Sequence, residues 1–522
     1  MSISRRDVLK AGSAAVVVAY TVRFTPARAQ SATTFDYYIS PTGDDVLGNG
    51  TLSNPWSITA LNSKHSTYGG KRVGLLPGVY QYGTSSGTQT TLYSILSKLS
   101  SANTSCALQV QGGTSSSPTY IGSSDSSGNY SARTAILDGS NPSGGGQPTG
   151  GGMFIGQSVN GSTVPTVTGY ITFDGIVVRN WNFAGIGFGG NVAGNNYVWN
   201  GINILNCEIS NGGGVPSSNN PGAIFFWKNA PGILIQNCMI HDITTTPGGA
   251  NSPWGMAAVM FNQDAGTGEG FTGTVDHCTM YHVGQGVTTK NNYSNVVVQY
   301  CYIEMANMGA FTGGAFQSCI YAGTQAPGNT VTYKYNVLVG GIWEHPEDGT
   351  ANAGSVVATN NTIYCGPGGG SSTDTLFFVF DNNGSSGSGT FNHNIVWSDG
   401  GYTTNSSQGS IGYNSAGAGM NFNYNYYGTG CTFGAGGYLG ANFTSWKSRG
   451  NDANSSTISS TPFVTSPASL NVPSFKVATQ YLTAADGKPC GALNSSGLAA
   501  DGSGGVGCDF SIPNAPVLSI VS

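Results

Sequence analysis

The sequence has 522 residues, of which only 8% are charged, and its formal net charge is −5. A mildly acidic chain without a run of basic residues is a poor candidate for nucleic-acid binding. The 81 glycines would suit a disordered chain, but 39% hydrophobic and 11% aromatic residues argue against disorder. The composition therefore indicates a folded protein with short strands and many turns.

The first residues read MSISRRDVLKAGSAAVVVAYTVRFTPARAQ. The pair Arg5 and Arg6 resembles that of a twin-arginine export signal, and an apolar stretch and a small-x-small sequence ending at Ala29 follow it. We therefore expect cleavage after Ala29 and a bacterial protein that is periplasmic or secreted. The apolar stretch is too short to span a bilayer, and no other segment is long and apolar enough, so we expect no stable membrane insertion.

One short phrase recurs nine times between Gly175 and Asn425, at spacings of 23 to 40 residues. In each copy an alternating apolar run leads to a polar residue, then to a frame position, then to a polar and an apolar residue. The period of two indicates strands, and the repeated phrase indicates stacked coils that bury their apolar faces against one another. The frame position is occupied by Gly175, Cys207, Cys238, Cys278, Cys301, Asn336, Asn361, Asn394 and Asn425.

The frame position is expected to face the interior of the stack. Buried cysteine behaves as a small hydrophobic residue that suits a narrow interior. An interior asparagine can form hydrogen bonds with the asparagines above and below it. The alternative for the cysteines is a metal site, but no CxxC pair supports one.

Three further segments carry a resemblance to a known fold. YYISPTG (37–43) with LLPGVY (75–80) resembles the opening segment of right-handed parallel β-helix proteins of the pectate-lyase-like superfamily. RTAILDG (133–139) resembles their first complete coil, and TSWKSRGNDANSS (444–456) with TPFV (461–464) resembles their final segment. The resemblance implies an all-β, single-stranded, right-handed parallel β-helix, or solenoid. It leaves the reaction open, because this fold carries lyases, hydrolases, esterases, epimerases and adhesins.

We expect one domain after a signal peptide at residues 1–29. Residues 30–139 are expected to form the opening segment and N-terminal cap, 140–427 the coils, and 428–522 the C-terminal cap and tail. Apolar residues at helical spacing within 89–105 predict a short capping helix. Cys490 and Cys508 are the expected disulfide pair, because the compartment permits disulfides. A capped solenoid can be monomeric, and we expect a monomer.

A second strand ladder lies between the copies of the phrase. Its inward positions are expected to be Ile186, Ile224, Val259, Val287 and Ile342. Alternate residues then point outward and bring aromatic, amide and charged side chains to one face, where a glycan could stack and form hydrogen bonds. The alternative is that loops cover these aromatic residues. The expected substrate-binding residues are Trp227, Phe225, Asn262, Trp343, Lys228, His241 and Asp242.

Lys290 ends one strand of this ladder and could serve as the base of a lyase, which removes a proton beside a uronate carboxylate. Relatives that are alginate lyases and pectate lyases place a lysine or arginine base on such a face. Some alginate-lyase-like members carry an arginine one coil later, which is absent here, where the sequence reads MANMGAFTGG. The alternative is an ordinary surface lysine.

A hydrolase instead needs two carboxylates roughly 5–10 Å apart across a glycosidic bond. Two outward columns of the phrase frame are expected to gather acids and imidazoles, one with His241, Tyr281 and Glu304 and the next with Asp242, His282 and Met305. The charged cluster IWEHPED (342–348) adds a further histidine. The expected catalytic residues are Lys290, His345, Asp264 and Glu304.

Calcium prefers several oxygen ligands, which Asp264, Glu347, Asp348 and Asp381 could supply together with asparagine oxygens. No spacing matches a known calcium motif, so Ca²⁺ stays an option and no cofactor is assigned. The expected function is that of an exported carbohydrate-active protein that acts on a polysaccharide as a polysaccharide lyase or a glycoside hydrolase. The alternative is a non-catalytic glycan-binding or cell-surface β-helix protein.

Overall fold

The structure is a computed structural model. It describes residues 34–81, 106–139, 153–160, 168–181, 184–191, 198–212, 222–227, 229–243, 257–262, 270–290, 293–305, 318–323, 328–344, 354–365, 378–380, 388–398, 411–413, 419–435, 438–465 and 475–508. The chain consists of two units, residues 1–32 and 33–522, and only the second contains described residues. The expected signal peptide and the expected capping helix at 89–105 lie outside these ranges.

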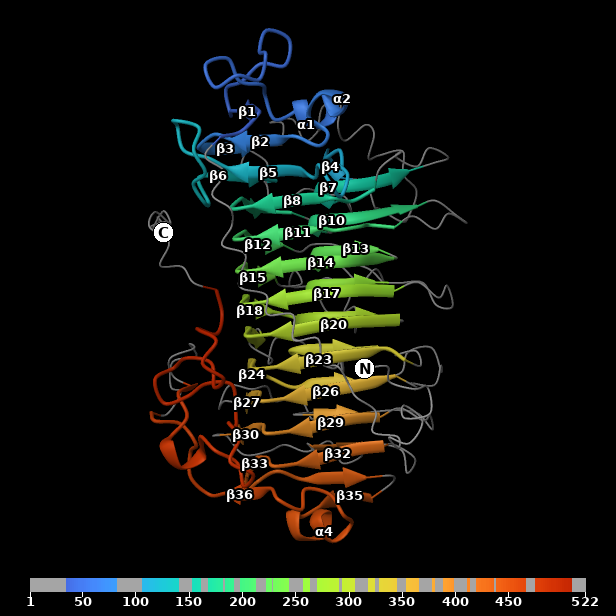
Figure 1. Cartoon of the computed structure of the whole chain (residues 1–522), viewed down its shortest axis with the longest axis vertical. Helices are drawn as coiled ribbons and strands as arrows, with labels where there is room; N and C mark the ends of the chain where they lie inside the picture. The colour runs from blue at the N-terminus through green and yellow to red at the C-terminus, as the bar shows by residue number, and fades with distance from the viewer. Residues whose placement is uncertain are drawn as a thin grey trace, which may run out of the picture. The chain divides into compact units, whose positions relative to one another are not determined.

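The described chain winds through three sheets of twelve strands each, and successive coils add strands to the same sheets (Figure 1). Sheet 1 contains β1 Tyr37–Ile39, β2 Arg72–Leu75, β5 Thr119–Ser123, β8 Ile171–Asp174, β11 Asn203–Leu205, β14 Ala230–Gln236, β17 Gly270–Asp276, β20 Tyr293–Gln299, β23 Thr330–Lys334, β26 Ser355–Thr359, β29 Ser388–Asn392 and β32 Gly419–Asn423.

Sheet 2 contains β3 Gly78–Gln81, β6 Ala135–Asp138, β9 Val177–Arg179, β12 Glu208–Gly212, β15 Met239–Ile243, β18 Thr279–Val283, β21 Tyr302–Met305, β24 Val337–Val339, β27 Thr362–Cys365, β30 Ile395–Ser398, β33 Tyr426–Gly428 and β36 Ser456–Ile458. Sheet 3 contains β4 Cys106–Gln109, β7 Met153–Asn160, β10 Ala184–Asn191, β13 Gly222–Trp227, β16 Ala257–Asn262, β19 Gln285–Lys290, β22 Ile320–Ala322, β25 Ile342–Glu344, β28 Phe378–Phe380, β31 Ile411–Tyr413, β34 Phe433–Ala435 and β35 Tyr438–Ala441.

Neighbouring strands pair in parallel, except for the antiparallel pair β34 and β35. The expected parallel β-helix is therefore confirmed. In the part of the chain that the structure describes, the helices are few and short: α1 Ala60–Ser63, α2 His65–Tyr68, α4 Phe443–Ser448 and the 3₁₀ helix η4 Thr479–Tyr481. Within the described ranges no helix has the length and apolar character needed to cross a membrane.

Sheet 3 confirms the second ladder that the sequence predicts. Ile186, Ile224, Val259 and Val287 stand in register and are buried. Ile320 then pairs with both Val287 and Ile342 and adds a rung that the sequence analysis missed. Its strand β22 has only three residues, which is too short a run to show an alternating pattern.

A two-residue corner joins sheet 1 to sheet 2 in the coils from β8 to β33. The first corner residue has a positive φ, as in Asn206 (54°), Asn237 (53°) and Gly175 (65°). Gly175 therefore occupies the first corner position and not the frame position, which corrects the prediction by one residue. Ile176 fills the frame position, since its carbonyl accepts a hydrogen bond from the next coil just as the carbonyl of Cys207 does.

The frame column runs through the interior, as predicted. Its members Cys207, Cys238, Cys278 and Cys301 are fully buried and free. The asparagines that follow form a hydrogen-bonded ladder. The amide of Asn361, for example, donates to Oδ1 of Asn394 at 3.0 Å, and Oδ1 of Asn361 accepts from the amide of Asn336 at 3.0 Å.

The C-terminal segment, defined as residues 461–465 and 475–508, runs back along sheet 2 toward β18 (Figure 1). It contains Cys490 and Cys508, which are both free, so the expected disulfide is wrong. Cys490 lies 3.6 Å from the carbonyl of Asn394, whereas the backbone of Cys508 bonds to Thr279. These two anchor positions are four coils apart, or about 19 Å at 4.8 Å per strand, far beyond the span of a disulfide.

Candidate functional site

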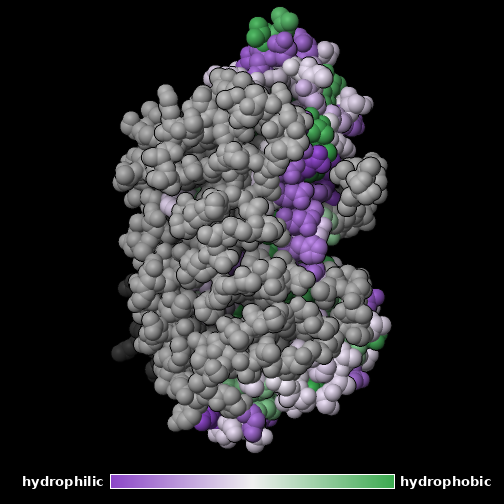
Figure 2. Space-filling model, turned by 180° about the vertical axis from the view of Figure 1, so that it is seen from behind, coloured by the Kyte–Doolittle hydropathy of each residue, from purple (hydrophilic) through white to green (hydrophobic). Residues whose placement is uncertain are grey.

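The candidate site lies on the outer face of sheet 2, on strands β9 to β21. Within these coils an alternating strand places every second side chain outward, and one outward column runs through Arg179, Ser210, His241 and Tyr281 in register. Seen from behind, hydrophilic residues form a band along the stack of coils (Figure 2). The polar face of sheet 2 is therefore defined here as the outer surface of β9, β12, β15, β18 and β21.

A second polar column on this face depends on an unusual backbone conformation. Asn180, Asn211, Asp242 and His282 stand one above the other in successive coils with φ of 56°, 52°, 54° and 51°. Asparagine, aspartate and histidine are enriched in this left-handed region among residues other than glycine. The column ends at His282, because Met280 pairs with Ile303 while Val283 pairs with Met305, which removes one residue from the register.

This register shift corrects one expectation and leaves another in place. Met305 pairs with Val283 and does not continue the column of Asp242 and His282. Tyr281 does stand in register with His241, as predicted. Two residues of β18, Tyr281 and His282, lie opposite one residue of β21, Glu304. The carboxyl group of Glu304 therefore belongs to the same face.

Four side chains form a row of alternating carboxylates and imidazoles. Oε1 of Glu208 lies 3.4 Å from Nε2 of His241, whose Nδ1 lies 2.7 Å from Oδ2 of Asp242. Oδ1 of Asp242 lies 3.0 Å from Nδ1 of His282. The side chain of His282 is 55% exposed and that of His241 only 13%, so His282 is the imidazole that a ligand can reach.

The environment moves the pKa values of the acids on this face in opposite directions. Burial raises the pKa of Glu304 above its ordinary value, against the hydrogen bond that the Tyr302 hydroxyl donates to Oε2 at 2.9 Å. Burial also acts to raise the pKa of Asp242, but hydrogen bonds from His241 and His282 outweigh it and hold that pKa low. Groups with pKa values pushed apart are suited to opposite roles in acid–base catalysis.

The two histidine rings are held in place by Tyr281. Its ring stacks on that of His241 with centroids 4.7 Å apart and meets His282 edge to face at 5.3 Å. Burial works against a charged His241, but its bonds to Glu208 and Asp242 raise its pKa on balance. His241 thus holds Asp242 in place through this bond, and the exposed His282 ends the row.

The aromatic face expected on sheet 3 differs from the prediction. Phe225 and Trp343 stand in the predicted outward column but are 0% and 1% exposed, and Asn262 is also buried. Phe225 packs with Ala184, Ala257 and Met260 in an apolar cluster on the outer side of the sheet, with the half-buried Trp227 against it. Phe225 and Trp343 therefore offer no open surface on which a sugar could stack, whereas Trp227 is only half-buried.

The side chains of the remaining expected site residues lie outside the described part of the structure, so their predicted positions stay predictions. The backbone of Lys290 ends β19 in register with Asn262, but its side chain lies outside the described part of the structure. Also outside it are Lys228, Asp264, His345 and the proposed calcium ligands Glu347, Asp348 and Asp381. Within the described residues, no group of three or more histidine, cysteine, aspartate or glutamate side chains is arranged to hold a metal ion.

The structure therefore brings together His241, Asp242 and Glu304 from the predicted site residues and adds two that sequence reasoning missed. Glu208 and Tyr302 directly follow the frame residues Cys207 and Cys301. A signal for them exists, because the position after a frame residue is the first outward position of each strand in sheet 2. Both point toward the face that carries the cluster.

No family model matches the chain, and a search of curated proteins finds no match either. Among solved structures, pectate lyase Pel9A shares 14% identity over 88% of this chain and 96% of its own, with a TM-score of 0.52. A GH136 lacto-N-biosidase from Eubacterium ramulus (12% identity, 81% and 67% covered, TM-score 0.44) and a rhamnogalacturonan lyase (15%, 82% and 90%, 0.43) also match. The chain thus has the right-handed parallel β-helix fold that Pel9A has, as its sequence predicts.

Proposed function

We propose that the protein cleaves the glycosidic bonds of a polysaccharide by hydrolysis at the polar face of sheet 2. The observation that carries this proposal is the pair Glu304 and Asp242, a carboxyl group with a raised pKa and a carboxylate with a lowered pKa on one face. His282, which lies 3.0 Å from Oδ1 of Asp242 through its Nδ1, stands on β18, the strand between those of Asp242 and Glu304.

In this proposal Glu304 is the general acid and gives its proton to the glycosidic oxygen as the bond to the anomeric carbon breaks. His282 is the general base and takes a proton from the water whose oxygen forms the new bond to that carbon. Asp242 holds Nδ1 of His282, which leaves Nε2 free for the water and stabilises the imidazolium that forms. The two protons exchange with solvent and return the site to its starting state.

The charges of the face favour hydrolysis of a neutral glycan. β-Elimination acts on a uronate, whose carboxylate needs neutralising by a cation or a basic group. In the described part of this face, Arg179 is already paired with Asp138 at 2.8 Å, and His241 is already paired with Glu208 and Asp242. A uronate carboxylate would have to compete with these acids for a cation, whereas the hydroxyl groups of a neutral glycan can bond to the amides and carboxylates.

A second reaction, β-elimination with Lys290 as the base, is favoured by one observation. The fold is that of pectate lyase Pel9A, and Lys290 stands at the end of a sheet 3 strand in register with Asn262. Hydrolysis would take place on sheet 2 and elimination on sheet 3, so a variant on one sheet tests only the reaction proposed for that sheet.

The test is an activity screen of the chain from Gln30 onward on neutral and acidic polysaccharides, with and without calcium. New reducing ends without the ultraviolet absorbance of an unsaturated uronate are expected. Glu304→Gln is expected to lower the rate by about 10²–10⁴-fold, while Lys290→Ala keeps it, and circular dichroism checks that both variants fold. New absorbance that Lys290→Ala abolishes and Glu304→Gln leaves intact would replace hydrolysis by elimination. Retention of a glycan without any product would favour a binding protein.

A further inference from the structure

The polar face of sheet 2 does not continue along the whole stack. Past Glu304 the outward column of sheet 2 runs through Val339, Tyr364 and Trp397. The column of left-handed residues also stops, since the register shift ends it at His282. The same sheet therefore presents polar side chains on β9–β21 and apolar side chains on β24–β30.

The C-terminal segment lies over the apolar part. Tyr302, Val337 and Tyr364 are buried in one cluster with residues of the segment, Phe463, Phe475, Ala492, Leu493, Ala499 and Val506. The ring of Phe475 meets that of Tyr364 edge to face at 5.3 Å. The apolar character of these coils is thus explained by what covers them, and this surface is not available to a ligand.

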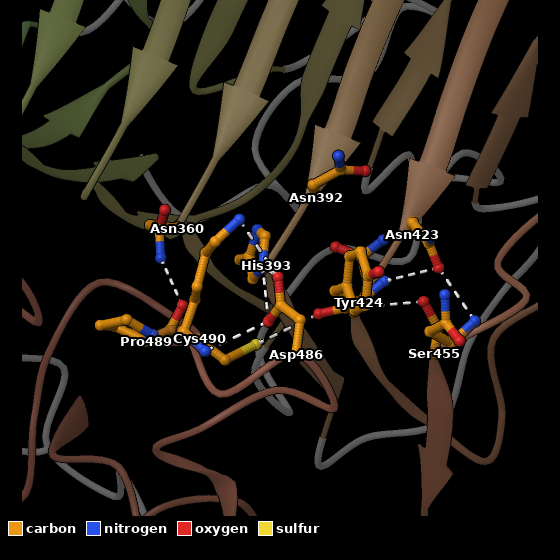
Figure 3. A network of polar contacts seen from close by, with 12 residues as sticks. Asn360, Asn392, His393, Asn423, Tyr424, Ser455, Asp486, Pro489 and Cys490 are labelled. Atoms are coloured by element: carbon orange, nitrogen blue, oxygen red, sulfur yellow. Dashed lines mark hydrogen bonds and ion pairs between the residues drawn. The ribbon is translucent and has the colours of Figure 1, made fainter.

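Polar anchors fix the segment along its length. Figure 3 shows the lower ones, where Nε2 of His393 lies 3.0 Å from Asp486 and the Asn360 amide donates to the carbonyl of Pro489 at 2.7 Å. Nearer the candidate site, the hydroxyl of Tyr300 donates to Asp501 at 2.7 Å. The backbone N–H of Cys508 donates to Oγ1 of Thr279 at 3.0 Å, and Thr279 lies on β18, the strand of His282.

The covered region begins beside the proposed general acid. Tyr302 lies in the cluster with Phe475 and also donates the hydrogen bond to Glu304. On the other side, Asp242, Asn211 and Asn180 continue away from Glu304 coil by coil at about 4.8 Å per step. Past Glu304 the segment covers the outer face of sheet 2 over Val337 and Tyr364, and its last described residue runs on along the edge of the polar face to Thr279.

We propose that the C-terminal segment blocks one end of the polar face of sheet 2 and that the protein is exo-acting, releasing short products from the end of a neutral polysaccharide. The polysaccharide lies along the column from Asn180 to His282, with its terminal units against the segment where it covers Tyr302. Glu304 then reaches only bonds close to that end. This inference rests on the proposed hydrolysis.

The test follows viscosity and reducing ends together on the polysaccharide that the activity screen identifies. An exo-acting enzyme produces short oligosaccharides from the first time points, and the viscosity falls slowly for each new reducing end. A rapid fall in viscosity with long early products would overturn the inference and leave the proposed hydrolysis standing. Absence of cleavage on every polysaccharide would overturn both.

A pair of variants tests whether the segment forms the closure. Asp501→Asn weakens the anchor to Tyr300 near the site and is expected to raise the share of longer products several-fold. Asp486→Asn weakens the anchor to His393 at the far end of the segment and is expected to leave the product lengths unchanged. Equal product lengths in both variants and the original protein, with residues 501–508 shown to be released by hydrogen exchange, would contradict a closure made by this segment.

Discussion

The coils of this β-helix fall into two regions that differ both inside and outside. From Ile176 to Cys301 the interior frame column is mainly cysteine, and the outer face of sheet 2 is polar. From Asn336 to Asn425 the column is asparagine, and the same outer face is apolar and covered by the C-terminal segment. The change occurs in one place, where the backbone N–H of Cys301 donates to Oδ1 of Asn336.

The two regions are suited to different roles. In the second region, hydrogen bonds between the interior asparagines and apolar contacts with the C-terminal segment hold the coils together, so little polar surface is left on sheet 2. In the first region the frame thiols fill the interior and donate weak hydrogen bonds to backbone carbonyls, and the exterior carries groups whose pKa values are shifted. The first region is thus the part of the stack where surface chemistry is available.

The largest effect expected from a single change is that of Phe475→Ala in the second region. Phe475 is fully buried between the segment and sheet 2, and deleting such a side chain costs about 4 kcal/mol. Chemical denaturation and limited proteolysis of the segment would measure the loss. The control is Leu498→Ala in the same segment, where the side chain is 48% exposed and a change within about 0.5 kcal/mol is expected. Similar losses in both variants would mean that the segment does not depend on this cluster.

A smaller difference is expected between the two kinds of frame residue. Asn361→Ala removes the acceptor of Asn336 and is expected to cost about 3 kcal/mol, since buried donors lose their partners. Cys238→Ala is expected to cost about 1 kcal/mol, because it removes one buried sulfur atom. Unfolding midpoints of the two variants would compare them. Equal costs would show that the ladder adds nothing to the packing of the column.

A corner of the first region, the one before Cys278, gives a pH-dependent contribution to stability. Burial disfavours both charges of the pair Asp276 and His277, but their bond at 2.8 Å lowers the pKa of Asp276 and raises that of His277. Asp276, whose pKa is lowered in the folded protein, adds to the stability of the fold above about pH 3.9, and this contribution is lost as the pH falls through its folded pKa. His277, whose pKa is raised in the folded protein, adds to stability fully below about pH 6.5, and this contribution is lost as the pH rises through its folded pKa.

Both effects are present together between about pH 4 and 6.5 and are expected to amount to about 1.5 kcal/mol. Denaturation midpoints from pH 4 to 9 would show the window, and His277→Asn is expected to flatten the profile. A profile unchanged by that variant would assign the pH dependence to other groups.

The smallest effect concerns the cysteines of the C-terminal segment. Burial raises the pKa of Cys490, and mainly burial raises that of Cys508 to about 12, so both thiols should react slowly at neutral pH. Peptide mapping without reductant is expected to find both free, and a reductant should leave the unfolding midpoint unchanged. A peptide that links Cys490 to Cys508 would contradict the path of the segment along sheet 2.

Much of the fold could be predicted because the frame residue recurs in every coil and alternation has a fixed period. Gly175 was assigned one position too late, because glycine and asparagine both suit a positive φ and the repeated phrase does not show which of its positions has that conformation. Glu304 was found by counting residues along each strand from the frame position. Met305 was misplaced because β21 has one residue fewer than β18 between paired positions, and nothing in the sequence marks that shift. Burial of Phe225 and Trp343 depends on contacts that alternation does not encode.

The route of the C-terminal segment also sets an order of assembly. Corresponding positions of neighbouring coils lie 23 to 40 residues apart, whereas Tyr300 and Asp501 are separated by 201 residues and Thr279 and Cys508 by 229. Contacts across long separations cost more loop entropy and form more slowly than local ones. Docking of the segment is therefore expected to be the last and slowest step of folding. A chain that is still on the ribosome, or shortened by a protease at its end, would carry every proposed reacting group on a face whose end is not yet covered.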